Sequence, residues 1–321
     1  MIVDLPDTTI SAVSKTLVTL REDGGAVALG RVLTLIIVSS DGEEEEEAIE
    51  AANDASREHP MRVIVVCRVD ADSAEPRLDA EIRVGGDAGA SEVIILRAHG
   101  EAASNEESLV TGLLLPDAPV VAWWPSRPPQ DVAHSPIGAI AQRRITDSST
   151  DENPESALLR LAEHYKPGDT DFAWTRLTLW RAQLAAVLDQ PPYEEVTAVS
   201  VSGAADSPST ILLAAWLQFA LGVTVEHDLT TDRSGIGGIH GVTLTRAGGE
   251  ISLERPESTI ASLSQPEQPT HDIALPRRTL RDCLAEELRR LDPDVLYGEV
   301  MTTGLPRFLS ETASTKGTSA A

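Results

Sequence analysis

The sequence has few aromatic residues, few cysteines and no long apolar run. Each of these shortages argues against some classes of protein. Its 321 residues include only five tryptophans, three tyrosines and three phenylalanines. No apolar stretch reaches the ~18–20 residues that a membrane-spanning helix needs. The N-terminus lacks the basic and apolar regions of a secretory signal. We therefore expect neither membrane insertion nor export, and we expect the protein in the cytoplasm.

Positive charge is also scarce. The chain has 26 lysines and arginines against 51 aspartates and glutamates, which gives a formal net charge of −25. A nucleic-acid-binding surface needs a basic footprint, and an anionic membrane surface is repelled by the same acidic charge. We therefore exclude nucleic acid and membranes as partners. The acidic field favours solubility and attraction to basic protein surfaces.

Residue patterns for catalysis, metal binding or nucleotide binding are missing. The seven histidines form no pair at metal-ligand spacing, and there is no Gly-x-Ser-x-Gly motif. Five glutamates at 43–47 occupy the first strand-to-helix turn, where a nucleotide phosphate would bind, and we expect a solvated helix start there. The sequence thus predicts no catalytic residue, no metal and no cofactor. Cys67 and Cys283 are expected to be buried free thiols, with a disulfide or redox pair as the alternative.

The first half of the chain alternates strands and helices, which predicts an α/β domain over residues 1–148. The strand–helix–strand order at 32–67 predicts a parallel pair with a right-handed crossover. A polar segment before Pro154 marks the linker. In order, we predict a helix at 8–22 that stops at Gly24–Gly25, a strand at 32–38, a helix at 43–57, strands at 62–67, 80–84 and 92–96 around a glycine-rich turn, and a strand that ends at the tryptophans.

The second half predicts another α/β domain over 149–307, followed by a small, polar, disordered tail at 308–321. Each of the two domains is expected to contain a small mixed or parallel sheet flanked by helices. The 201–206 segment follows a predicted strand, where α/β proteins bind ligands; it is either a small-anion site or a plain connector. The glycines at 235–241 miss dinucleotide spacing and predict a flexible loop. We predict helices at 155–165, 172–188, 209–221 and 279–291, strands at 196–201 and 223–227, and a hairpin at 242–254.

The most concentrated feature is the pair Trp123–Trp124, directly before Pro125. Neighbours on a strand point to opposite faces, so one indole ring is expected to face outward, where tryptophan is enriched at binding hot spots. The alternative is that both rings cap the core. Arg143–Arg144 follows soon after. In so acidic a chain, this doublet and those at 277–278 and 289–290 are expected to pair with carboxylates. For Arg143–Arg144, which lies close to the tryptophans, the alternative is a joint anion or partner site.

Seven segments carry a family resemblance that extends collinearly over about residues 1–305. They are RVLTL (31–35), EAANDASREHP (50–60), EIRVGGDAGAS (81–91), LLLPDAPVVAWWP (113–125), RRITD (143–147), PGDTDFAWTRLTLWR (167–181) and CLAEELRRLDP (283–293). Together they resemble the actinobacterial glucose-6-phosphate dehydrogenase assembly protein family, OpcA. The length of the match makes it specific, since no single motif is diagnostic.

The resemblance implies a non-enzymatic partner that assembles or allosterically activates glucose-6-phosphate dehydrogenase in the oxidative pentose phosphate pathway, and so supports NADPH supply. Activation requires tighter binding to the competent state of the dehydrogenase. A sugar-phosphate effector is left open. The alternatives are a phosphosugar-binding protein or lactonase-like hydrolase of the same pathway, and a purely structural scaffold. The candidate partner-binding residues are Trp123, Trp124, Arg144, Arg176 and Arg181.

Overall fold

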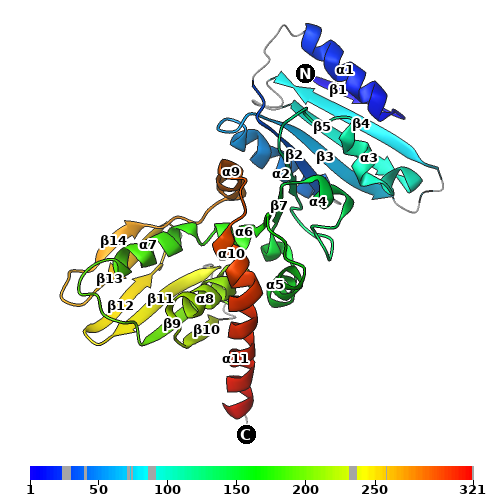
Figure 1. Cartoon of the computed structure of the whole chain (residues 1–321). Coiled ribbons are helices and arrows are strands. Elements are labelled where there is room, and N and C mark those ends of the chain that lie inside the picture. Colours follow the sequence, from blue (N-terminus) through cyan, green and yellow to red (C-terminus); the bar gives the residue numbers. More distant parts are fainter. Residues whose placement is uncertain are drawn as a thin grey trace. The chain divides into compact units, whose positions relative to one another are not determined.

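Two β-sheets, one of eight strands and one of six, organise the chain in the computed structural model (Figure 1). The structure describes residues 1–23, 30–39, 42–70, 73, 75–85, 92–230, 237–257 and 259–319. The predicted stop at Gly24–Gly25 lies outside these residues. Contacts divide the chain into unit 1 (Met1–Thr146, Gly168–Thr170, Thr279–Pro293) and unit 2 (Asp147–Pro167, Asp171–Arg278, Asp294–Ala321). The predicted class of two α/β domains is confirmed.

Unit 1 contains a parallel sheet with an antiparallel edge. Its strand order is β1-β4-β5-β3-β2-β6-β7-β8. Neighbours within the run β5-β3-β2-β6-β7 are parallel, whereas β4 is antiparallel to β5 and β1 is antiparallel to β4. Central parallel strands are covered on both faces and are therefore continuously apolar. The predicted parallel pair, now β2 and β3, is confirmed. The strands are β1 (Ile2–Leu5), β2 (Leu33–Ser39), β3 (Met61–Asp70), β4 (Arg77–Val84), β5 (Glu92–His99), β6 (Val120–Trp123), β7 (Arg143–Thr146) and β8 (Asp169–Asp171).

The helices of unit 1 include one that comes from far along the sequence. Helix α9 (Leu280–Arg289) begins with a capping box between Thr279 and Asp282, and it packs against α2 (Gly42–Ala55), which also contacts β2 and β3. The sequence placed α9 within a continuous second domain, whereas the structure assigns residues 279–293 to unit 1. The other helices among the described residues of unit 1 are α1 (Ile10–Asp23), η2 (Gly100–Ala103), α3 (Glu106–Thr111) and α4 (Pro136–Ile140).

A buried ion pair connects α9 to β7. The Arg143 Nε donates to Glu287 Oε2 at 2.9 Å, the Arg143 Nη2 contacts the same oxygen, and Nη1 donates to the Asp292 carbonyl at 2.8 Å. Both side chains are only 6% exposed. Since an isolated charge is very costly to bury, each side chain is tolerated in the interior because the other is present.

Neutralising this pair should destabilise unit 1. Glu287→Gln keeps the side-chain shape but leaves the Arg143 charge buried and unpaired, so we expect a loss of about 3–5 kcal/mol in the free energy of unfolding. The measurement is urea unfolding followed by circular dichroism. Glu286→Gln is the matched control, because it makes the same change in a more exposed pair with Arg289 and should cost less than about 1 kcal/mol. Equal losses for the two variants would contradict the assignment.

Cys67 and Cys283 are both free and buried, as expected. The Cys67 Sγ donates to Glu45 Oε2 at 3.0 Å. Burial, followed by the Glu45 carboxylate, raises the pKa of the Cys67 thiol well above its ordinary value. Glu45 itself is 5% exposed and lies 2.6 Å from Arg97 Nη2, so the expectation of a wholly solvated helix start is wrong at this residue.

Both thiols should therefore be unreactive in the folded protein. The thiolate is the nucleophile, and the raised pKa of Cys67 keeps that thiol protonated at pH 8. Titration with an aromatic disulfide reagent should detect almost no thiol in the native protein and two after denaturation. Val69→Cys is the control: position 69 is on the same strand and 54% exposed, so this variant should react with one rapid equivalent. A rapid equivalent in the unmodified protein would refute the prediction.

Unit 2 contains a mixed sheet in the order β10-β9-β11-β12-β13-β14. Strands β9 and β10 are parallel, and the other neighbours are antiparallel. The predicted hairpin is confirmed, because β11 and β12 pair up to Arg246 and Gly249. Gly249 has a φ of 129°, which favours glycine. The strands are β9 (Ala198–Ala204), β10 (Val225–Thr230), β11 (Ile239–Arg246), β12 (Gly249–Glu254), β13 (Ile260–Ser264) and β14 (His271–Ala274).

The core of unit 2 holds most of the few aromatic side chains. Trp174, Trp180, Tyr297 and Phe308 are each at most 2% exposed, and the Trp174 and Tyr297 rings lie 5.6 Å apart. Helix α8 packs against β9, β10, η4 and α11 (Figure 1). The helices are η3 (Ser148–Thr150), α5 (Pro154–Glu163), α6 (Phe172–Thr175), α7 (Thr178–Leu188), α8 (Pro208–Leu221), α10 (Val295–Glu299), η4 (Val300–Gly304) and α11 (Leu305–Ser319).

Two segments of unit 2 differ from the sequence-based expectation. The single helix expected at 172–188 is divided into α6 and α7, because Leu177 N bonds the Trp174 carbonyl three residues back and tightens the turn. The tail expected to be disordered from residue 308 is helical through Ser319, with Leu305 and Phe308 buried at its start. Among the described residues, no helix is long and apolar enough to cross a membrane.

Candidate functional site

The tryptophan pair is buried. Trp123 is 0% exposed and Trp124 3%, so the expectation that one ring faces outward is wrong and the alternative, with both rings in the core, is confirmed. Trp123 on β6 pairs in register with Ile37 on β2 and Ile145 on β7, between two parallel neighbours. A role for either tryptophan in partner binding stays a prediction, and their burial gives it no support.

Arg144 is occupied by contacts within unit 1. It is 7% exposed; its Nη1 donates to the Ala141 carbonyl at 2.8 Å, and its Nε forms an ion pair with Asp169. Its backbone N–H donates to the Gly168 carbonyl at 2.9 Å. These bonds hold the segment around β8 against β7, so Arg144 stabilises the fold.

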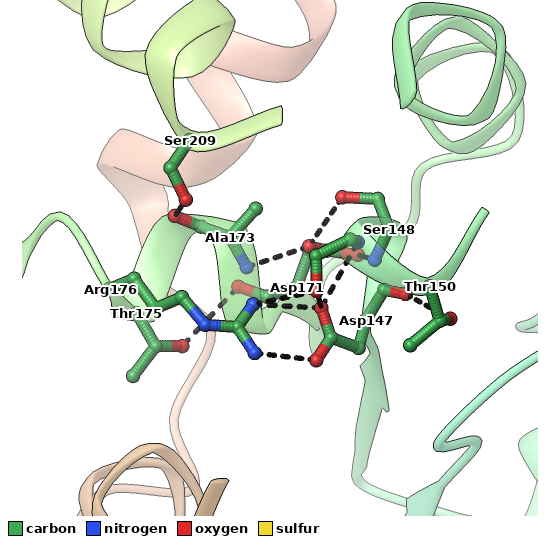
Figure 2. A network of polar contacts seen from close by, with 9 residues as sticks. Asp147, Ser148, Thr150, Asp171, Ala173, Thr175, Arg176 and Ser209 are labelled. Carbon is green, nitrogen blue, oxygen red and sulfur yellow. Dashed lines mark hydrogen bonds and ion pairs between the residues drawn. The ribbon is translucent and has the colours of Figure 1, made fainter. Parts of the chain in front are cut away.

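Arg176 in unit 2 forms a two-pronged ion pair with Asp147 (Figure 2). Its Nη1 and Nη2 donate to Asp147 Oδ1 and Oδ2 at 2.8 and 2.7 Å. Such bidentate pairs are among the strongest charge-assisted hydrogen bonds. The Asp147 side chain is 2% exposed and that of Arg176 is 26% exposed, so the charge on Arg176 is neutralised while part of its surface stays accessible.

Asp171 organises the polar network around this pair (Figure 2). Its Oδ1 accepts from Ser148 Oγ and the Ala173 N–H, each at 2.8 Å, and its Oδ2 accepts from the Ser148 N–H at 3.0 Å. It thereby caps α6. Ser209 Oγ donates to the Ala173 carbonyl at 2.9 Å. The network therefore fixes Arg176 close to the start of α8.

Arg181, the last candidate, stacks on an aromatic ring. Its Cζ lies 3.9 Å from the Trp174 ring centroid, a favourable cation–π distance, and its side chain is half-buried. The structure therefore divides the five candidates: Trp123, Trp124 and Arg144 belong to unit 1, and Arg176 and Arg181 belong to unit 2.

A cavity of about 330 Å³ lies beside Arg176 within unit 2. It is at the carboxyl end of β9, where the sequence placed a ligand site or a connector at 201–206. Its lining includes Trp180, the beginning of α8 at Ser207–Ser209, and four arginines: Arg176, Arg255, Arg277 and Arg278.

Two of these arginines, the buried Arg255 and the exposed Arg277, have no carboxylate partner among the described residues. Arg255 is 6% exposed; its Nη2 donates to the Ile239 carbonyl at 2.9 Å, and its Cζ lies 5.3 Å from the Trp180 ring centroid. Burial, and then the charge of Arg277, lowers the pKa of Arg255 to about 10. Burial also lowers the pKa of Arg277. Both remain protonated at neutral pH, and no carboxylate among the described residues pairs with either one.

The sequence identified this site only in part. The Arg277–Arg278 doublet was visible, but pairing with carboxylates was the expected outcome, as found for Arg143 and Arg289. Arg255 has no basic neighbour in the sequence, so no pattern marked it as a candidate site residue. Residues 232–236 of the predicted glycine loop lie outside the described residues; Gly238, with a φ of 82°, lines the cavity. No group of three potential metal ligands occurs in the described part of the chain.

Comparisons with known proteins match both halves of the chain. Residues 52–163 match the family of N-terminal domains, and residues 167–301 the family of C-terminal domains, of the glucose-6-phosphate dehydrogenase subunit. Together these two domain families account for most of the sequence. The chain belongs to the OpcA family.

Two cyanobacterial proteins described as OxPP cycle protein OpcA are similar to this chain. The protein of Synechocystis sp. (strain ATCC 27184 / PCC 6803 / Kazusa) is 32% identical over 103 residues, which are 31% of this chain and 22% of that protein. The protein of Nostoc punctiforme (strain ATCC 29133 / PCC 73102) is 31% identical over 123 residues, 36% of this chain and 26% of that protein. The match spans about a quarter of the length of these relatives.

Among solved structures, an oxidoreductase from Sinorhizobium meliloti superposes with a TM-score of 0.49 and 8% identity, over 88% of this chain and 97% of that one. A likeness at this level has no bearing on activity.

Proposed function

We propose that this chain is a non-catalytic partner of glucose-6-phosphate dehydrogenase that promotes its active assembly or activates it. The observation that supports the proposal is the pair of matched domain families, both described as parts of a glucose-6-phosphate dehydrogenase subunit. The relatives described as OxPP cycle proteins support a role in the oxidative pentose phosphate pathway, and through it in NADPH supply. A cytoplasmic location stays a prediction.

Activation by docking needs only a difference in affinity between two states of the dehydrogenase. A tenfold effect requires ~1.4 kcal/mol of preference for the competent state. The net charge of −25 would speed encounter with a basic patch on the enzyme and would make the association rate fall as salt is added. Of the five candidates, Arg176 and Arg181 keep accessible surface, so they are the stronger contact residues, whereas Trp123, Trp124 and Arg144 would act through the fold.

The proposal predicts a stoichiometric complex and altered dehydrogenase kinetics. Mixing the full chain with the purified dehydrogenase should give a larger species in light scattering and change the KM, kcat or oligomeric state of the enzyme, within the ~5–150-fold range typical of coupling between sites. Arg181→Ala should weaken the complex at least about fivefold. Arg307→Ala, at an exposed pair with Glu311, is the control and should not.

Two results would overturn the proposal. The first is a dehydrogenase whose size and kinetics are the same with and without the chain. The second is turnover of 6-phosphogluconolactone by the chain alone, faster than in buffer, which would establish the lactonase alternative instead. An unchanged complex with Arg181→Ala would remove only that residue from the contact surface.

A further inference from the structure

The cavity in unit 2 concentrates positive charge in a chain that is strongly acidic. Arg176 is neutralised by Asp147, but no carboxylate among the described residues contacts Arg255 or Arg277. The carboxylate that lines the cavity, Asp206, lies exposed at its edge. Within the described part of the chain, the charge of these two arginines is therefore available to an anion from solution.

Arg255 supplies a second, independent observation. Its side chain is buried, and among the described residues its Nε has no hydrogen-bond partner. Leaving a buried charged donor unsatisfied is costly, and most buried polar groups in proteins have partners. The indole ring of Trp180 lies on one side of the guanidinium and the Ile239 carbonyl holds Nη2, so the group is fixed in position before any ligand arrives.

The start of α8 adds to the field in the cavity. This helix has 14 residues, and Ser207 caps it by accepting from the Thr210 N–H. The N-terminus of a helix carries partial positive charge and attracts phosphate groups. Because α8 follows β9, this end lies at the carboxyl edge of the parallel pair β9–β10, the common ligand position in α/β proteins.

Size and donor chemistry define the class of ligand. A volume of about 330 Å³ is at the lower end of the ~300–1,000 Å³ of small-molecule sites, which favours a single small metabolite. Planar guanidinium groups match the geometry of phosphate oxygens, and Asp206 and Ser207 offer hydrogen bonds to hydroxyl groups. We propose that this cavity binds a small phosphorylated polyol or sugar, with its phosphate on Arg255 and Arg277 at the start of α8.

Calorimetric titration of the full chain without any dehydrogenase tests this site, so its outcome is independent of the proposed function. The probes are glucose 6-phosphate, inorganic phosphate and glucose. We expect glucose 6-phosphate to bind most tightly, phosphate more weakly and glucose not measurably. Equal affinity for the phosphate ester and for phosphate would overturn the assignment of a phosphorylated metabolite, and absence of binding by both at millimolar concentration would overturn the site.

Single substitutions test whether glucose 6-phosphate binds in this cavity. Arg277 is exposed at the rim, so Arg277→Ala should leave the fold intact and raise the Kd for glucose 6-phosphate at least about tenfold, the loss expected for a charged hydrogen bond. Arg290→Ala is the control: it removes the same charge at an 81% exposed side chain of unit 1 and should leave the Kd unchanged. Unaltered binding by Arg277→Ala, or equal weakening in both variants, would refute the site.

The buried arginine gives a second variant. Arg255→Lys keeps the charge but loses the planar donor pair, so we expect weaker binding of the ester with a thermal unfolding midpoint close to that of the parent. If this variant binds glucose 6-phosphate as tightly as the parent, Arg255 does not hold the phosphate and the proposed geometry is wrong.

Discussion

Compensation of buried guanidinium charge is the constraint on which the architecture depends. Removing arginine from water is tolerated only when a carboxylate or another acceptor replaces the lost hydration. In unit 1, Arg62 lies 2.8 Å from the buried Glu92, and Arg143 meets Glu287, 144 residues away. In unit 2, Asp147 plays the same part for Arg176. These pairs join segments that are distant in sequence and fix where they meet, whereas the exposed pairs on the same helices contribute little.

The cavity of unit 2 departs from this rule. Arg255 is held by the Ile239 carbonyl and the Trp180 ring, which orient a cation without cancelling its charge. The Asp147–Asp171 network is held firmly because both oxygens of each carboxylate accept hydrogen bonds (Figure 2). Among the described residues that line it, the cavity therefore combines an arginine paired with a carboxylate, Arg176, and one held only by a carbonyl and an indole ring, Arg255, an arrangement suited to recognising one end of a polar molecule.

Local patterns predicted local structure well. The parallel pair β2–β3, the β11–β12 hairpin and α8 follow from apolar runs and turn residues that act over a few positions. The burial of both tryptophans did not follow, because alternation along a strand says which face a residue points to and not what covers that face. The assignment of α9 to unit 1 reflects its packing against α2 and the contact of Glu287 with Arg143, neither of which periodicity can encode.

In the candidate site, too, some features could be predicted from local sequence and others depend on distant contacts. The β9–α8 connection could be identified from sequence, since ligands gather at the carboxyl ends of parallel strands. Arg255 could not, because only the sheet brings the residue after β12 beside a helix that begins almost fifty positions earlier. Arg277 was noticed for its charge, yet whether a basic doublet is neutralised depends on which acidic residues the fold brings within reach.

The discontinuity of unit 1 has a consequence for synthesis of the chain. Its last strand, β8, ends at Asp171, but residues 279–293 belong to the same unit, so the partner of Arg143 leaves the ribosome only when most of the protein has been made. Until then the first unit carries an uncompensated cation and an uncovered face of α2. Unit 2 also ends with a late segment, Asp294–Ala321, so neither unit has all of its residues until the last part of the chain has been translated.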